Sequence, residues 1–475
     1  MAKNAIDSTK ELETKKISAL LWAYALPAVM SQIIASVYSI VDRMFLGQCV
    51  GYLALAGLAI TMPIMNIIHA FGSLVGAGSS ARMSIVLGRK DEHWAEKILG
   101  NSMLLTFFFG FLFVAGGYLF MNPILEAFGA SSETISFARE YMYIVLPGMF
   151  LTTLTFNLTG LIRASGYPNK AMWIMCSGAV LNIALDALFI YKLRWGIAGA
   201  AWATTASMAF SSVLAVWHFV RKSSFIRFKR HAWAPKMYIF RNILAIGISP
   251  FSMNVGAFIV VALLNHQLIH FGGDLAVSAY GVVNSVCGLV VMLFLGLCQG
   301  MQPIAGYNYG AGQNERLREV YLLTMKVCVG VGIVGALLTC LFPRPMIRCF
   351  ASDEPLIAMG IPALRYLTVF MPFIAYTIVN SQFFQSIDKP WIAIVTSLSR
   401  QVLFLIPLIY IVPNIFTHFG GEGLTGVWAA CTVSDIMGAM LSTGLLLGQL
   451  KVFKPGYVAP TRKPRKERGP KEKNN

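Results

Sequence analysis

The sequence predicts an all-α membrane protein in which about twelve transmembrane helices form two six-helix bundles, related by pseudo-two-fold symmetry along the membrane normal. The first observation behind this fold class is composition: the chain is 56% hydrophobic and only 12% charged, with a mean hydropathy of +0.65. The second is that Lys and Arg gather in particular segments, and the third is that the two halves of the chain resemble each other. Soluble domains carry about 25% charged residues, so this composition excludes an ordinary soluble protein.

The apolar residues form long blocks that are typical of membrane-spanning helices. A helix needs about 20 apolar residues to cross a bilayer, whereas transmembrane β-strands are short and alternate in polarity. The blocks therefore predict helices and argue against a membrane β-barrel. We expect the spans at 17–41, 53–87, 98–121, 135–162, 170–191, 197–220, 239–270, 277–308, 319–342, 358–384, 390–413 and 424–450.

The net charge of +17 is spread unevenly along the chain. Basic residues cluster in the N-terminal arm 1–16, at 89–97, in the linker 221–238 and in the tail 451–475, which is Pro- and Lys-rich and expected to be disordered. With twelve crossings these segments share one side, and the opposite loop at 272–274 has no basic residue. The positive-inside rule then places both termini in the cytosol of a bacterium, with the chain in its cytoplasmic membrane. The expected partner of the basic runs is anionic lipid rather than nucleic acid.

The two halves come into register when the sequence is moved along itself by about 223 residues. Pro27 in ALPAVMSQ then falls on Pro250 in GISPFSMN. We expect an N-lobe at 17–220 and a C-lobe at 239–450, each with about six spans. Because six is even, both lobes enter the membrane in the same sense, as parallel transporter repeats do. Two lobes with a cleft between them suit alternating access, although duplication also occurs in channels.

Carboxylates inside expected spans are the leading candidates for a functional site, because a charged side chain at membrane depth costs at least about 2.5–3.5 kcal/mol. Asp42 lies near the end of the first span, and Asp186 lies in the fifth, one helical turn after Asn182. The direction of the sixth span brings Thr204 to the same depth. Such oxygen ligands suit Na⁺, and a close carboxylate pair can hold a proton. The alternative is that both carboxylates only cap helices.

Other polar residues within the spans have weaker assignments. Arg400 and Asp435 lie at matched depth in the C-lobe and are expected to form a structural ion pair, with Arg400 the only cation expected deep in the membrane. Pro27 removes a helical hydrogen bond and is a candidate hinge. Asn66 and His69 are candidates for lining a substrate cavity, with side-chain packing as the alternative.

Several segments together resemble the multidrug and toxic compound extrusion (MATE) family, and within it the MepA-like and DinF-like bacterial branch. The resemblance covers about residues 15–450 and rests on PAVMSQIIASVYSIVDRMFLGQ, NLTGLIRASGYPNKAM, LNIALDALFIY, WGIAGAAWATTAS, QGMQPIAGYNYGAGQ and GVWAACTVSD.

The resemblance implies two six-helix bundles in a V shape and export of drugs in exchange for Na⁺ or H⁺. It implies a hinge at Pro27, a cavity position at Tyr38, and an N-lobe cation site formed by Asp42, Asn182, Asp186 and Thr204. Some relatives carry an acidic residue in the seventh span, where this chain has Asn254 and Asn265. A second cation site in the C-lobe is therefore not expected.

The expected function is cation-coupled antiport, by alternating access, of small organic molecules that are cationic or amphipathic. A lipid-linked sugar flippase of the same superfamily is the alternative, disfavoured because such proteins line their cavity with several cationic residues. A membrane enzyme would need a catalytic motif such as HExxH or GxSxG, and none is present. We expect no cofactor, no metal beyond a coupling Na⁺, and a monomer.

Overall fold

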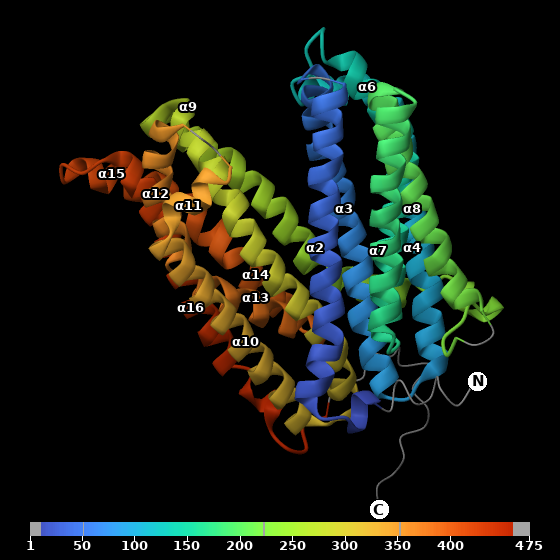
Figure 1. Ribbon diagram of the computed structural model, residues 1–475. Helices are drawn as coiled ribbons and strands as arrows, with labels where there is room; N and C mark the ends of the chain where they lie inside the picture. The colour runs from blue at the N-terminus through green and yellow to red at the C-terminus, as the bar shows by residue number, and fades with distance from the viewer. Residues whose placement is uncertain (1–10, 51, 222–223, 351–352, 459–475) are drawn as a thin grey trace, which may run out of the picture.

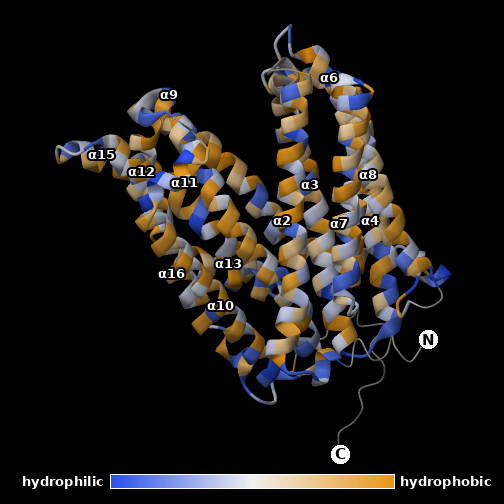
Figure 2. Cartoon of the chain, viewed as in Figure 1, coloured by the Kyte–Doolittle hydropathy of each residue, from blue (hydrophilic) through white to orange (hydrophobic). Residues whose placement is uncertain are grey.

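The computed structural model describes residues 11–50, 52–221, 224–350 and 353–458, and these ranges contain helices and no strand. Parts of the predicted arm 1–16 and tail 451–475 lie outside the described residues. The helices form two groups that diverge toward one end of the molecule (Figure 1). Apolar residues dominate the long helices of both groups (Figure 2).

The first group, the N-lobe, contains six long helices. α7 ends at Asp186, and the chain continues without a break as the π-helix η1. The short α5 (Met121–Ala127) lies between α4 and α6. The bounds of the long elements are α2 (Ile17–Cys49), α3 (Tyr52–Gly88), α4 (Glu92–Leu119), α6 (Ile135–Ala164), α7 (Pro168–Asp186) with η1 (Ala187–Lys192), and α8 (Gly196–Val220).

The second group, the C-lobe, follows the linker that carries the short η2 (Arg230–Trp233). It ends before the short η4 (Leu450–Phe453). Its elements are α9 (Met237–Ala311), α10 (Asn314–Leu341), α11 (Pro343–Arg348), α12 (Glu354–Thr368), α13 (Met371–Ser386), α14 (Pro390–Leu398), the π-helix η3 (Ser399–Leu405), α15 (Ile406–His418) and α16 (Gly423–Leu447).

The predicted twelve spans are present among the described residues. Ten helices are long and apolar enough to cross a membrane, and the pair α12 and α13, bent by 46°, makes an eleventh span. The 75-residue α9 is two spans joined at Gly273, whose φ of 65° and ψ of −165° end the first helix. Glycine adopts this conformation without a steric penalty, so the turn needs no longer loop. α9 therefore supplies the twelfth span.

The observed bounds differ from the predicted ones at several spans, and two of these differences have a clear local cause. The span expected at 358–384 is broken between α12 and α13, where Pro372 cannot donate a backbone hydrogen bond. The span expected to begin at residue 98 begins at Glu92, because the Asp91 side chain accepts a hydrogen bond from the backbone nitrogen of Trp94 at 3.1 Å and caps the helix. Hydropathy does not detect such a polar first turn.

The lobes pack together at the end of the molecule that carries the linker 221–236, called here the linker end. One apolar cluster spans both lobes there and includes Ile17 and Leu158 of the N-lobe with Ile239 and Phe383 of the C-lobe. Two further clusters are each confined to one lobe, around Leu46 in the N-lobe and around Trp428 in the C-lobe. The lobes are therefore joined at the linker end and separate at the other, the open end (Figure 1).

Glycines allow α3 and α9 to approach closely at the linker end. A Cβ atom at Gly88 would collide with the carbonyl oxygen of Tyr307, and one at Gly310 would collide with that of Ile85. These two contacts are reciprocal between the lobes, as the internal repeat requires. Small residues at a helix crossing are the usual means of close packing in membranes.

Candidate cation site and central cavity

The predicted cation site lies where α7 passes into η1. Asp186 is the last residue of α7 and is fully buried, and Asn182, one turn earlier, is 2% exposed. The chain then forms η1, which is wider than an α-helix. π-helical segments are rare and frequently occur at functional sites. Sequence reasoning placed both residues on one helical face but did not anticipate η1.

The structure brings the four predicted site residues close to one another. Asn182 Nδ2 lies 3.5 Å from Thr204 Oγ1 on α8. Asp42 and Thr204 line the same small cavity, and Asp42 contributes to the electrostatic environment of Asp186. The phenol of Tyr141, from α6, is buried and interacts with Asp42, Thr204 and Asp186. Tyr141 was not identified from the sequence, because nothing in its local pattern distinguishes it from a packing tyrosine.

Four buried oxygens of this site have no hydrogen-bond donor among the described residues. They are both carboxylate oxygens of Asp186, Asn182 Oδ1 and Asp42 Oδ1. Burying a polar group without a partner is costly, and burying an unpaired charge costs more. A bound proton or a cation relieves this cost, and neutral and charged oxygens are the ligands that hard cations take. The arrangement can therefore hold a cation.

A central cavity of about 350 Å³ lies beside this site and is lined by both lobes. Asn182 and Thr204 form part of its N-lobe wall, together with Tyr38 and His69. Asn254 of α9 lines the C-lobe side and donates through Nδ2 to Ser73 Oγ on α3 at 3.4 Å. The volume falls within the range of small-molecule sites.

A smaller cavity of about 200 Å³ adjoins the central cavity in the N-lobe and contains Asp42. Tyr38, His69 and Thr204 line both cavities, whereas Asn66 lines only the smaller one. His69 also packs edge-on against Phe156 at 5.5 Å between ring centroids. With Thr152 and Met208, which also line both cavities, five residues thus separate the space where a solute fits from Asp42.

Comparison with known proteins identifies the family. The MatE family model matches residues 27–188 and 245–411, which is more than half of the chain. This chain belongs to the MATE family. Its relatives include the multidrug export protein MepA of Staphylococcus saprophyticus, 23% identical over 91% of this chain and 94% of the relative. MepA of Staphylococcus aureus strain MRSA252 is also 23% identical, over 90% of this chain and 94% of the relative.

Solved structures show the same fold. A superfamily transporter from Pyrococcus furiosus has a TM-score of 0.86 at 24% identity, covering 93% of this chain and 97% of that one. An outward-facing MATE structure has a TM-score of 0.85 at 24% identity, covering 93% and 97%. This MATE chain therefore shares the family's two-lobed twelve-helix architecture.

Pro27, the predicted hinge, lies buried in the first half of α2. The helix runs without interruption from Ile17 to Cys49, and Ser31 Oγ donates a hydrogen bond to the Pro27 carbonyl oxygen at 2.8 Å. That bond satisfies a carbonyl close to the site where the proline ring removes a backbone donor.

The C-lobe of this MATE protein contains a charged pair inside its helices. Arg400 Nη1, in η3, lies 3.1 Å from Asp435 Oδ1 on α16, and the Asp435 side chain is 5% exposed. Neither residue lines the central cavity. The two predicted partners are thus in contact, and their structural role stays a prediction.

Besides Arg400, two arginines of the described helices, Arg82 and Arg163, are buried. Arg163 lies beyond the predicted end of the fourth span at 162, but α6 continues to Ala164, and Arg163 is 9% exposed and lines the central cavity. Arg82 of α3 is also buried, and its Nη1 lies 3.0 Å from Asp388 Oδ2 of the C-lobe. Hydropathy tolerates single charges near helix ends, so neither residue was noticed.

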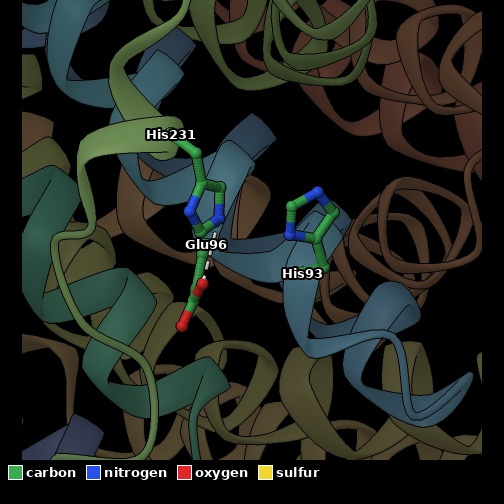
Figure 3. Close-up of side chains that lie close together, drawn as sticks. All are labelled: His93, Glu96 and His231. Carbon is green, nitrogen blue, oxygen red and sulfur yellow. Dashed lines mark ion pairs between the residues drawn. The ribbon is translucent and has the colours of Figure 1, made fainter.

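A group of potential metal ligands lies where the linker meets the first turns of α4 (Figure 3). The Oε2 atom of Glu96 lies 3.1 Å from His231 Nε2, its Oε1 lies 2.7 Å from Lys229 Nζ, and the rings of His93 and His231 stack at 4.5 Å. Lys229 already neutralises buried Glu96, so these contacts explain the group without a metal ion. They hold the linker against α4.

Proposed function

We propose that this MATE protein is an antiporter that uses H⁺ or Na⁺ to export small amphipathic organic molecules from the cytosol by alternating access. The observation that carries the proposal is the set of four unpaired buried oxygens on Asp42, Asn182 and Asp186, beside a cavity shared by both lobes. The names of its relatives, which are multidrug export proteins, support the same function.

The position of the carboxylates supports coupling between cation and solute. Thr204, Tyr38 and His69 line both the cavity and the smaller space that contains Asp42. When a cation neutralises Asp186, a different arrangement of α2, α7 and α8 becomes favourable. Because these helices line the cavity, its wall then changes as well. Coupling requires only that the ion and the solute favour different states of the lobe. α2, weakened at Pro27, is the element proposed to bend.

Transport by reconstituted protein tests the proposal. Purified protein in liposomes should move ethidium when a proton or sodium gradient is imposed, and the two gradients applied separately identify the ion. Asp186→Asn should abolish gradient-driven movement while the protein still folds, because the amide cannot release and rebind a cation in the same way. Asp274→Asn, in the exposed turn within α9, is the matched control and should behave as wild type.

The proposal fails if Asp186→Asn and Asp42→Asn both transport ethidium at the wild-type rate. It also fails if wild-type liposomes respond to neither gradient. Equal folding of the variants is checked by their thermal unfolding midpoints in detergent.

A further inference from the structure

The central cavity has an unexpected charge. Of the described residues that line it, none is Asp or Glu, and Arg163 is the one Lys or Arg among them. Asp42 borders only the smaller cavity, and Asp186 borders neither. The wall that would contact a transported molecule is therefore cationic, although the coupling site beside it is acidic.

Arg163 is buried without a partner in the described part of the chain. It lies in the last turn of α6 and is 9% exposed, and its guanidinium makes no hydrogen bond or ion pair with a described residue. Two other arginines within the lobes do have carboxylate partners: Arg82 has Asp388 at 3.0 Å, and Arg400 has Asp435 at 3.1 Å. A buried charge without a counter-ion is strongly unfavourable. Arg163 therefore lacks the carboxylate partner that Arg82 and Arg400 each have.

Amide donors line the same cavity from the opposite lobe. Gln302 of α9 donates through Nε2 to Gln382 Oε1 of α13 at 2.6 Å. Gln385, one turn further along α13, is 1% exposed, and its Nε2 atom has no acceptor among the described residues. An anion bound by Arg163 would thus find additional N–H donors on the C-lobe side. Charge-assisted bonds of this kind are among the strongest in proteins.

We propose that Arg163 is the subsite for an anionic group, a carboxylate or phosphate, of the molecules that this protein transports. The substrates then include organic anions or zwitterions. A guanidinium offers parallel N–H donors that match both groups in a bidentate arrangement. This inference rests on the proposed export function for its physiological meaning, while the binding site itself does not depend on coupling.

Binding of a matched pair of fluorescent probes tests the subsite on the full-length protein in nanodiscs. Dansylglycine carries a carboxylate, and dansylglycinamide is its neutral analogue. Wild type should bind the carboxylate about 10-fold or more tightly than the amide, as expected for hydrogen bonds to a charged group. Arg163→Gln should remove this preference, and Arg163→Lys should retain part of it because the charge remains. Arg241→Gln, an exposed arginine on α9 outside the cavity, should preserve it.

Competition identifies the source of the anion. Displacement of dansylglycine by benzoate indicates a soluble organic acid, and displacement by lysophosphatidate indicates a lipid phosphate. Either result supports the subsite. Equal affinity of the wild type for the two probes overturns the inference, and this result does not depend on whether the variants fold. An unchanged preference for the carboxylate in a folded Arg163→Gln protein also overturns it.

The ethidium assay separates this inference from the proposed function. Ethidium has no acidic group, so its gradient-driven movement by the wild type reports coupling without requiring the Arg163 subsite. Coupled ethidium transport without a carboxylate preference contradicts only the subsite. A carboxylate preference that depends on Arg163, in a protein that responds to no ion gradient, contradicts only the antiport.

Discussion

Two buried carboxylates of this protein, Asp435 and Asp186, differ in their hydrogen-bond partners. Asp435 accepts a hydrogen bond from Arg400, whereas both oxygens of Asp186 lack a donor among the described residues. The two aspartates were equally visible in the sequence. A paired carboxylate stabilises one arrangement of helices, while an unpaired one changes its energy whenever a cation binds. This contrast separates the proposed structural site from the proposed coupling site.

The Arg400–Asp435 pair yields a stability prediction at the residue scale. Asp435→Asn alone should lower the thermal midpoint markedly, because breaking a buried pair costs about 3–5 kcal/mol by leaving a charge uncompensated. The double variant Arg400→Gln, Asp435→Asn should recover part of this loss. Glu354→Gln is the control, because its bonds to Arg344 and Arg348 are exposed and should contribute little. A double variant no more stable than the worse single variant contradicts the pairing.

Among the helices, α2 is the element proposed to bend, with Pro27 as its hinge. Pro27→Ala restores a backbone donor inside the helix, where proline costs about 3 kcal/mol or more relative to other residues. The variant should be more stable to heat and should transport ethidium more slowly, because a stiffer α2 opposes bending. Pro147→Ala, at another proline inside a helix of the same lobe, should leave the transport rate unchanged. Wild-type transport by a stabilised Pro27→Ala protein would show that α2 need not bend there.

The crossing of α3 and α9 closes the linker end, and the Arg82–Asp388 pair fastens it. Its side chains are only 7% and 5% exposed and belong to different lobes. Arg82→Gln should weaken this closure and shift the population toward a state open at the linker end. Spin labels at Ser132 and Asp274, on the open-end tips of the two lobes, should then move closer together. Arg82→Lys retains the charge and should shift less, and an unchanged distance distribution in Arg82→Gln would mean that the pair does not hold the closure.

For the whole molecule, the orientation in the membrane is a prediction: it states which end of the protein faces the cytosol. The basic linker should be cytosolic under the positive-inside rule. It is held on α4 by Asn101, whose Nδ2 donates to the Ala234 carbonyl at 3.1 Å and whose Oδ1 accepts from the Lys236 backbone nitrogen at 2.8 Å. The linker therefore moves with the N-lobe.

Cysteine labelling of intact cells checks this orientation. In a background without native cysteines, Lys229→Cys should resist a membrane-impermeant maleimide added outside, and Asp274→Cys should react. Both positions are exposed in the structure, so accessibility differs only through the membrane. Labelling of Lys229→Cys from outside would show that the orientation is opposite to the predicted one, and the proposed direction of transport would then be wrong as well.

The sequence alone was enough to predict the fold and the candidate cation ligands. Span length and the repeat depend only on local hydropathy and spacing, so they are readable without any tertiary contact. Asp42, Asn182, Asp186 and Thr204 were identifiable because a polar residue at membrane depth is conspicuous wherever its helix packs.

Only the tertiary structure decided what each polar residue contacts. Arg82 and Asp388 are 306 residues apart, and their pairing depends on how closely glycines let two lobes approach. Arg163 is one residue beyond a predicted span, and nothing in the sequence shows that it faces a shared cavity without a counter-ion. Helix periodicity determines which residues share a face, but packing determines what that face meets. Charge balance inside a membrane protein is therefore a property of its assembled helices.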